Sequence, residues 1–394
     1  MERVRTIGLL VSLAFMGPVA AATSAQSHED TSIRNAVQAF MRQYDVPGVV
    51  VGLTVNGKQQ FYDFGVASRD MKQQVNRDTL FEVGSISKTF TATLTAYAEV
   101  NGQLSLTDHP GKYFPELAGT AFDKATLLDL GTHTAGGFPL QLPADIQGAA
   151  QLMAYFKAWK PQYPAGTQRT YANPSVGMLG IITARAMQVP FDVAMEKQLF
   201  PKLGLSSTYI HVPADQMSRY AQGYTSKNAP VRVNPGVLAD EAHGVKTSAR
   251  DLLHFVEVSL DEVKVEPKLQ QAIANTHIGY FTLGGMTQDL IWEQYSYPVN
   301  RDALLEGNSS KVALQNQPVT RLVPPLVPQQ DVLINKTGAT NGFGAYVAFI
   351  PARKIGIVIL TNRNHPTDAR VLLAHAILSV LDESKSGSGG TAPQ

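Results

Sequence analysis

With 394 residues, of which 44% are hydrophobic and 16% charged, the chain can bury a large core and is too apolar to be disordered. Lysine plus arginine (33) balances aspartate plus glutamate (32), so the overall charge gives no reason to expect a nucleic acid or an acidic membrane surface as partner. There is no cysteine, which excludes disulfides, thiolate catalysis and cysteine-ligated metal sites.

The N-terminus has the pattern of a secretory signal peptide over residues 1–22. Two arginines precede an apolar stretch at 7–16 that is too short to span a bilayer, and small residues follow it. We place the cleavage after Ala22, with Ala25 as the alternative. The mature protein is therefore expected in the periplasm, without a membrane anchor after cleavage.

The first elements after the signal peptide indicate a helix and a hairpin. Ser32–Tyr44 has apolar residues at a helical period, and the dense β-branched run Val49–Val55 indicates a strand. Asn56-Gly57 is a strong hairpin signal, and Gln60–Ala67 reads as the returning strand. We expect the helix to lie on this antiparallel hairpin.

Residues 81–92 indicate an apolar approach, a turn at Gly84 and a helix that continues to Val100. Ser85 falls at the start of this helix, and Lys88 lies on the same face one turn later. A serine hydroxyl becomes a good nucleophile only when a base takes its proton. A lysine can be that base if burial or a nearby cation lowers its pKa from about 10.4. The motif alone leaves a second interpretation open, an N-cap serine followed by a solvent-facing lysine.

Between residues 102 and 219, helix-like segments alternate with joints rich in proline and glycine. This pattern predicts a mostly helical domain over residues 102–219. The expected helices are Leu127–Leu130, Ala150–Trp159, Ser175–Met187 and Phe191–Leu199.

The C-terminal part has the clearest pattern. Three apolar runs read as successive strands, Val332–Thr337, Gly344–Ile350 and Ile355–Thr361. Thr367–Leu381 follows as an amphipathic helix, and the Gly/Ser-rich tail, residues 384–394, is expected to be disordered.

Strands near both ends of the chain, with helices between them, predict an α/β fold of the α+β kind. Residues 27–101 and 220–383 would together form an antiparallel sheet domain with flanking helices. The mostly helical domain at 102–219 would be inserted between these two parts.

Two further motifs follow along the chain. Tyr171-Ala172-Asn173 lies in a proline-flanked loop, and Lys336-Thr337-Gly338 ends a C-terminal strand, followed by Ala339. In the order Ser-x-x-Lys, Tyr-x-Asn and Lys-Thr-Gly, these motifs resemble the three signatures of penicillin-recognising serine enzymes. More specifically, the chain resembles the class C β-lactamases, the periplasmic cephalosporinases. The resemblance covers essentially the whole mature chain, including residues 132–137 and 341–346.

The resemblance implies a role for each motif residue. Ser85 would attack the lactam carbonyl and become acylated, with Lys88 or Tyr171 as the base; the sequence leaves that choice open. Tyr171 would also pass a proton to the leaving nitrogen and activate water for deacylation. Lys336 would be a second cation: at about 5 Å and an effective dielectric near 20, its repulsion of Lys88 is about 3 kcal/mol, or roughly two pKa units. The oxyanion would lie between the backbone N–H groups of Ser85 and Ala339.

The resemblance also implies substrate contacts. Gln141 and Asn173 match positions that hold the acylamino side chain of the substrate. Thr337 and Arg370 match positions near the substrate carboxylate, and Glu293 matches an acidic residue near the reaction centre.

Three of these residue patterns have plainer interpretations. Arg370 could be a solvated arginine at the start of a helix, and Asn173 could be a turn residue. Lys-Thr-Ser at 246–248 resembles the Lys-Thr-Gly motif but is interpreted as structural, because Ser248 is placed to cap a helix that starts at Ala249.

The sequence departs from the family pattern at His243. The matching segment of the family usually reads Ala-Tyr-Gly-Val-Lys, and here residues 242–246 read Ala-His-Gly-Val-Lys. Thr367 also stands where asparagine is common. Both positions would contact the substrate, with His243 beside the acylamino pocket, where its unperturbed pKa near 6.5 would let it titrate. The nine histidines show no metal-binding spacing, so neither a metal nor another cofactor is expected.

The leading hypothesis is a serine β-lactamase that acts on cephalosporins and penicillins as a monomer. A penicillin-binding DD-peptidase or a related esterase shares the fold and the Ser-Lys-Tyr core, so the motifs alone do not separate them. A third hypothesis is a sensor domain that stays acylated by a β-lactam. Such sensors are usually tethered by a transmembrane helix, and the sequence shows no such segment.

Overall fold

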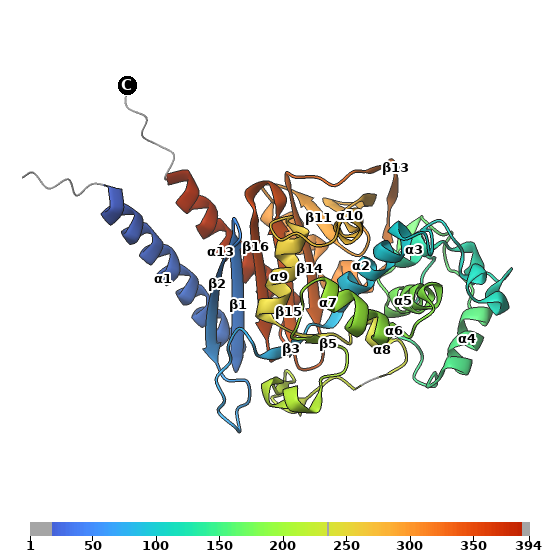
Figure 1. The fold of residues 1–394 in the computed structure, drawn as a ribbon, viewed down its shortest axis with the longest axis horizontal. Helices are drawn as coiled ribbons and strands as arrows, with labels where there is room; N and C mark the ends of the chain where they lie inside the picture. Colours follow the sequence, from blue (N-terminus) through green and yellow to red (C-terminus); the bar gives the residue numbers. More distant parts are fainter. Residues whose placement is uncertain (1–17, 235, 388–394) are drawn as a thin grey trace, which may run out of the picture.

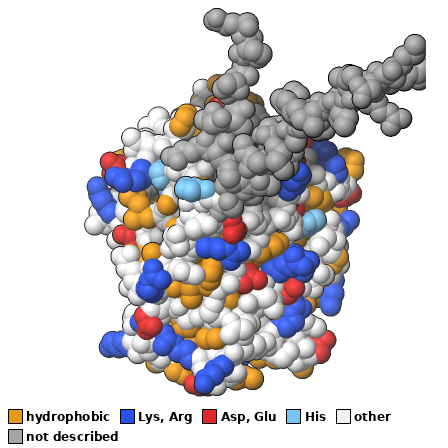
Figure 2. All heavy atoms as spheres, turned by 90° about the vertical axis from the view of Figure 1, so that its left-hand side faces the viewer, with side chains coloured by type: hydrophobic (Ala, Val, Ile, Leu, Met, Phe, Trp, Pro, Cys, Tyr) orange, Lys and Arg blue, Asp and Glu red, His pale blue; other side chains and the backbone are white. Residues whose placement is uncertain are grey.

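The computed structural model describes residues 18–234 and 236–387. The predicted signal peptide therefore lies mostly outside the described residues, and residues 18–22 form the start of the first helix. Within the described residues, no helix is both long enough and apolar enough to cross a bilayer. Figure 2 shows basic and acidic side chains interspersed over the face that carries the first helix, in keeping with the balanced composition.

A nine-stranded sheet forms the centre of the described residues, with the order β13-β9-β10-β11-β14-β15-β16-β1-β2. Every neighbouring pair is antiparallel. The sheet is built from both ends of the chain, as predicted. Its strands are β1 (Gly48–Val55), β2 (Lys58–Gly65), β9 (Gly279–Leu283), β10 (Met286–Gln288), β11 (Glu293–Ser296), β13 (Thr320–Leu326), β14 (Val332–Ala339), β15 (Gly344–Ile350) and β16 (Ile355–Thr361).

The hairpin of β1 and β2 forms where the sequence predicts it. Val55 pairs with Lys58, so Asn56 and Gly57 make a two-residue turn. Both turn residues have positive φ (51° and 73°), the conformation that Asn-Gly favours in hairpins. β1 then pairs with β16 and joins the N-terminal hairpin to the C-terminal strands.

Helices cover both faces of the sheet. α1 (Pro18–Tyr44) and α13 (Thr367–Gly387) lie side by side on one face, and α9 (Ala249–Ser259) packs on the other (Figure 1). In β16, Ile357 and Ile359 face the α1–α13 layer, whereas Val358 and Leu360 face α9. The alternating apolar run therefore fills two cores.

The C-terminal end of α13 and the N-terminal end of α9 bear on two predictions. α13 ends at Gly387, so the first four residues of the predicted disordered tail, 384–387, are helical; residues 388–394 lie outside the described residues. Ser248 caps α9, because its hydroxyl accepts the N–H of Asp251 at 3.1 Å. The structural interpretation of Lys-Thr-Ser at 246–248 is thereby confirmed.

The mostly helical part has its own apolar core, which includes the C-terminal half of α2 (Ser87–Val100). The segment at 191–199 is not one regular helix: a π-helical turn at Ala194–Leu199 follows a single α-helical turn. The remaining α-helices of the described residues are α3 (Leu127–Gly131), α4 (Ala149–Ala158), α5 (Asn173–Met187), α6 (Phe191–Val193), α7 (Phe200–Lys202), α8 (Ala239–Ala242), α10 (Pro267–Thr276), α11 (Arg301–Gly307) and α12 (Ser310–Leu314).

A pair of short strands connects the mostly helical part to the part that contains the nine-stranded sheet. β4 (Gln168–Arg169) pairs with β12 (Gln317–Pro318), which fixes the loop before Tyr171 against the segment that leads into β13. The remaining short strands are β3 (Leu80–Glu82), β5 (Thr208–Tyr209), β6 (Gly223–Tyr224), β7 (Pro230–Val231) and β8 (Lys246–Ser248).

Candidate active site

Ser85 lies in a 3-10 turn, Gly84–Ile86, that packs directly on the end of β14. Gly84 has φ of 50°, and a Cβ on it would lie 2.5 Å from the backbone nitrogen of Ala339. A Cβ on Gly338 would overlap the carbonyl oxygen of Val83. Only glycine allows this approach at either position, and the approach sets the backbone of Ser85 beside that of Ala339.

Ser85 is not a helix cap. Neither the 3-10 turn nor α2 has a side-chain capping hydrogen bond, and Ser85 lies one residue before Ile86, the residue that precedes α2. The N-cap interpretation is therefore wrong. The side chain of Ser85 is partly exposed, as a nucleophile must be.

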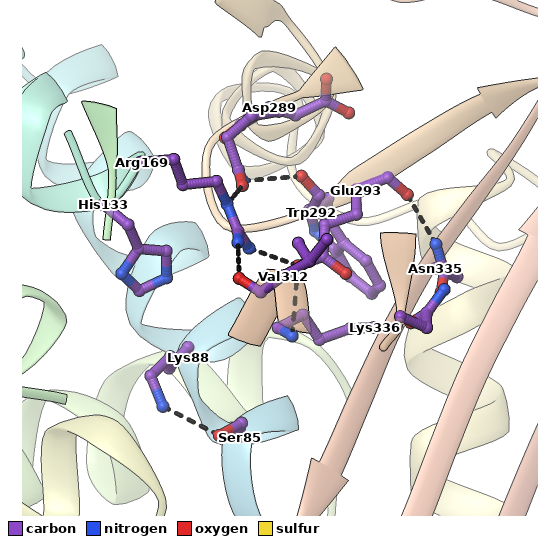
Figure 3. Close-up of polar contacts among 12 residues, drawn as sticks. Ser85, Lys88, His133, Arg169, Asp289, Trp292, Glu293, Val312, Asn335 and Lys336 are labelled. Carbon is purple, nitrogen blue, oxygen red and sulfur yellow. Dashed lines mark hydrogen bonds and ion pairs between the residues drawn. The ribbon is translucent and has the colours of Figure 1, made fainter. Parts of the chain in front are cut away.

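Lys88 is fully buried at the N-terminal end of α2, so the interpretation as a solvent-facing lysine is also wrong. Its Nζ lies 3.0 Å from Ser85 Oγ, 2.6 Å from Asn173 Oδ1 and 2.9 Å from the carbonyl oxygen of Ala242 (Figure 3 marks the contact with Ser85). Three acceptors satisfy the three donors of an ammonium group. Asn173 is the first residue of α5, and its side chain contacts Lys88 rather than serving only in a turn.

The pKa of Lys88 is lowered, as predicted from the sequence. Burial is the largest effect and favours the neutral amine. The charge of Tyr171 raises the pKa again, and repulsion from Lys336 lowers it further. Of the two causes that the sequence suggested, burial is therefore larger than repulsion from Lys336.

Tyr171 lies between two lysines. The Nζ atoms of Lys88 and Lys336 are 5.1 Å and 5.2 Å from the centre of its ring. Burial alone would raise the pKa of the phenol, but the two ammonium groups and hydrogen bonds with Ser85 and Lys88 lower it to about 8. A partly ionised phenol at this position can both accept and donate a proton near neutral pH.

A buried ion network supports Lys336. Glu293 Oε1 lies 3.6 Å from Lys336 Nζ and 2.8 Å from Arg169 Nη2, and all three side chains are buried (Figure 3). Arg169 also donates to Gln288 Oε1 at 2.6 Å and to the carbonyl oxygen of Val312 at 3.2 Å. The guanidinium thus links the loop before Tyr171 to the strand that carries Glu293.

The sequence interpretation missed Arg169. A usable signal was present, because Arg169 is the one charged residue between Lys160 and Arg185 and stands two residues before Tyr171. A lone charge in an apolar stretch is a candidate for burial with a partner.

The motif residues meet at a cavity of about 360 Å³. Ser85, Tyr171 and Lys336 line it. It also brings together all the predicted substrate contacts except His243, namely Gln141, Asn173, Glu293, Thr337, Ala339 and Arg370. The segment 307–314 and Leu140 form another wall that the sequence analysis did not find, because nothing in their residue types marks them.

Arg370 is buried, at 1% exposure, so the solvated interpretation is wrong. Its Nη2 donates to Thr367 Oγ1 at 3.1 Å, while Nε and Nη1 have no hydrogen-bond partner among the described residues. Burial lowers its pKa to about 10. The first turn of α13 packs against β15 and carries Arg370 inward, which the periodicity of the helix did not show.

His243 lines an adjacent cavity of about 250 Å³, which shares Gln141 and Asn173 with the first. Burial and the nearby charges of Lys88 and Lys246 lower its pKa to about 4. The expectation that His243 titrates near neutral pH is therefore wrong. The imidazole of His243 is neutral near pH 6.5, where the unperturbed pKa had predicted that its charge would change.

Comparison with known proteins decides the family. The family model named Beta-lactamase matches residues 33–382, which is most of the chain. The chain belongs to the β-lactamase family. A β-lactamase of Lysobacter lactamgenus is 58% identical over 369 residues, which cover 94% of this chain and 96% of that relative.

Solved structures share the fold of this β-lactamase. A β-lactamase/D-alanine carboxypeptidase from Pseudomonas syringae is 53% identical, with a TM-score of 0.88 and coverage of 89% of this chain and 99% of the other. A class C β-lactamase in complex with cefoxitin is 49% identical, with a TM-score of 0.87 and coverage of 90% and 99%. The predicted fold class and the family inferred from the three motifs are confirmed.

Proposed function

We propose that this β-lactamase hydrolyses cephalosporins and penicillins through a covalent acyl-enzyme on Ser85. The observation that carries the proposal is the contact of 3.0 Å between Ser85 Oγ and Lys88 Nζ at the edge of the cavity, where burial lowers the lysine's pKa. Once Lys88 has lost its own proton, which the lowered pKa favours, its amine can accept the hydroxyl proton at this distance. Class C enzymes with this fold support the same reaction class.

Acylation would proceed through a tetrahedral intermediate. The Ser85 oxygen would bond to the lactam carbonyl carbon, and its proton would pass to Lys88, whose Nζ is 3.0 Å away, or to ionised Tyr171, which forms a hydrogen bond with Ser85. The oxyanion would lie between the backbone N–H groups of Ser85 and Ala339, which Gly84 brings together. The C–N bond would then break, and Tyr171, protonated at that stage, would give its proton to the leaving nitrogen.

Deacylation needs a water molecule and a base. The Tyr171 phenolate, with a pKa of about 8, is our candidate for that base. The Glu293–Arg169 pair would keep Lys336 beside the tyrosine, so that its positive charge continues to favour the phenolate. The ester bond to Ser85 breaks, the open-ring product leaves and the proton returns to the serine.

The substrate contacts extend this proposal. Thr337 and Arg370 would hold the substrate carboxylate, since two Arg370 nitrogens lack a partner within the part of the chain that the structure describes. Gln141 and Asn173 would hold the acylamino group. His243 would shape the adjacent cavity that continues this acylamino side. From the pattern at residues 1–22 we further propose export to the periplasm, and we expect the mature enzyme to be a monomer.

The test is hydrolysis of nitrocefin and cephalothin by the mature chain, with a D-Ala-D-Ala peptide assayed in parallel. The peptide is included because the Pseudomonas syringae neighbour is described both as a β-lactamase and as a D-alanine carboxypeptidase. Fast lactam turnover with negligible release of D-alanine supports the proposal. Peptidase activity without lactam turnover would instead support the DD-peptidase hypothesis.

A further inference from the structure

His133 contacts the chain on both sides of Tyr171 and the tyrosine ring itself. Its carbonyl oxygen accepts the N–H of Thr170 at 2.8 Å, and its Nδ1 accepts the N–H of Ala172 at 3.3 Å. Its ring lies against the ring of Tyr171, with 4.4 Å between the centres and an angle of 43° between the planes. One residue thus contacts three consecutive residues of the loop that presents the phenol.

The backbone of His133 is held in an uncommon conformation. Its φ of 61° lies in the left-handed region, and its side chain is 1% exposed. Thr134 fixes the following peptide, because its N–H donates to the carbonyl oxygen of Asp129 at 2.8 Å and its hydroxyl donates to the Asp129 carboxylate at 3.0 Å. Residues held in such a conformation by their surroundings concentrate at functional sites.

The His133 ring is uncharged in a region rich in cations. Arg169, Lys88 and Lys336 all lie near enough to disfavour a charged imidazole, and Figure 3 shows the ring on the side of the site that carries Arg169 and Lys88. Burial, followed by these cations, lowers the pKa of His133 well below its ordinary value. Because Nδ1 accepts a hydrogen bond, the ring proton is on Nε2, which is buried without a partner in the described residues. A neutral ring with this tautomer can act on Tyr171 through its ring contact and its hydrogen bond with Ala172, and adds no charge to the site.

We propose that His133 is a positioning residue for Tyr171, fixing the ring and the adjacent backbone so that the hydroxyl stays beside Ser85 and Lys88. The inference rests on the proposed function for its role in turnover. Its geometric content is independent of that function. Without His133, the phenol could turn away from the two lysines, and both proton transfers by Tyr171 would slow.

Two variants separate the two kinds of contact. His133→Asn keeps an acceptor near the position of Nδ1 and tolerates the left-handed conformation, but removes the ring. His133→Phe keeps an aromatic ring and removes the acceptor. For each we expect kcat with a cephalosporin to fall about 10- to 100-fold, the usual effect of a small misplacement of a catalytic group, with a much smaller change in KM.

The pH profile distinguishes positioning from simple structural support. If Tyr171 moves away from Lys88 and Lys336, their positive charges stabilise its phenolate less, and its pKa should increase from about 8 toward 10. The pH at which kcat reaches half of its upper plateau should increase with it. Ultraviolet titration of the phenolate, with Tyr171→Phe as the blank, measures the same midpoint without any turnover. This readout applies to every variant that folds.

His277→Asn is the matched control. His277 is also buried against aromatic rings, Trp292 and Phe349, and its pKa is likewise lowered, but it lies outside the cavity that Tyr171 lines. We expect this variant to lose stability and to keep the wild-type midpoint. Circular dichroism and thermal unfolding identify the variants that fold.

The outcomes are distinguishable. If either folded His133 variant shows the raised phenolate midpoint and His277→Asn does not, the positioning role is supported. If both His133 variants fold and keep the wild-type midpoint and kcat, His133 is only structural and the proposal is overturned. If the wild type turns over no β-lactam, the proposed function fails, and the phenolate titration still decides the geometric inference.

Discussion

The carboxylate of Glu293 lies 2.8 Å from the guanidinium of Arg169, and both side chains are almost fully buried. Without Arg169, the buried carboxylate of Glu293 would keep only the longer contact of 3.6 Å with Lys336 and would lose the cation that donates a hydrogen bond to it. We therefore expect Arg169→Met to lower the free energy of unfolding by about 3–5 kcal/mol, measured by urea denaturation. Arg250→Met is the control, because its pair with Asp78 is exposed and should contribute at most about 1 kcal/mol. Equal losses in the two variants would show that the Arg169 pair has no special role.

Replacing Tyr171 with Phe removes the hydroxyl that we place in both proton transfers. Turnover of a cephalosporin should fall by a factor of about 10² to 10⁴, the range for a positioned acid–base group. Single-turnover kinetics resolve whether acylation, deacylation or both become slow. Wild-type rates in both steps would remove Tyr171 from the mechanism.

The pH dependence of deacylation follows from the same residue. The pKa of Tyr171 is lowered to about 8, and the ionised form is the proposed base, so the rate constant should rise as pH increases through about 8 and level off above it. The measurement is the deacylation rate of the isolated acyl-enzyme between about pH 6.5 and 9.5. A rate that is constant over this range, or that falls with pH, contradicts a phenolate base.

His243 should affect the substrate by its size and not by its charge. Its pKa of about 4 makes it neutral above about pH 5, so the preference among cephalosporins should not change between pH 6 and 7.5. Compared with His243→Tyr, the wild type should favour a bulky oxyimino cephalosporin over a small one, because the smaller ring leaves more room in the adjacent cavity. The ratio of kcat/KM for the two substrates measures this. An equal ratio in both proteins would show that the side chain does not shape the substrate pocket.

Much of the fold could be predicted because local patterns determined it. The Asn-Gly turn, the strands around 344–350 and 355–361 and the helix from Thr367 follow from turn chemistry and periodicity. The pairing of β1 with β16 joins residues some 300 positions apart, and the sequence supports it only through the general rule that strands near both termini form one sheet. The π-helical turn at 194–199 had no recognised signal.

The part of the site that short motifs mark could be predicted from the sequence. The properties that depend on burial could not. Short motifs mark Ser85, Lys88 and Tyr171 in the sequence, so their meeting in the structure could be predicted. Their catalytic roles stay a prediction. The burial of Arg370 and the shifted pKa of His243 depend on which elements pack around them. The residue pattern of a single helix or loop does not show which other elements pack against it.

The central claim is that Ser85 becomes covalently acylated by a β-lactam. The most direct measurement is the intact mass of the mature chain after mixing with a slowly hydrolysed β-lactam, for the wild type, Ser85→Ala and Ser87→Ala. Ser87 is a buried serine two residues away whose hydroxyl accepts the N–H of Val245 at 3.0 Å, so its variant serves as the control. We predict one adduct on the wild type and on Ser87→Ala, and none on folded Ser85→Ala. An adduct that persists on Ser85→Ala would contradict the account.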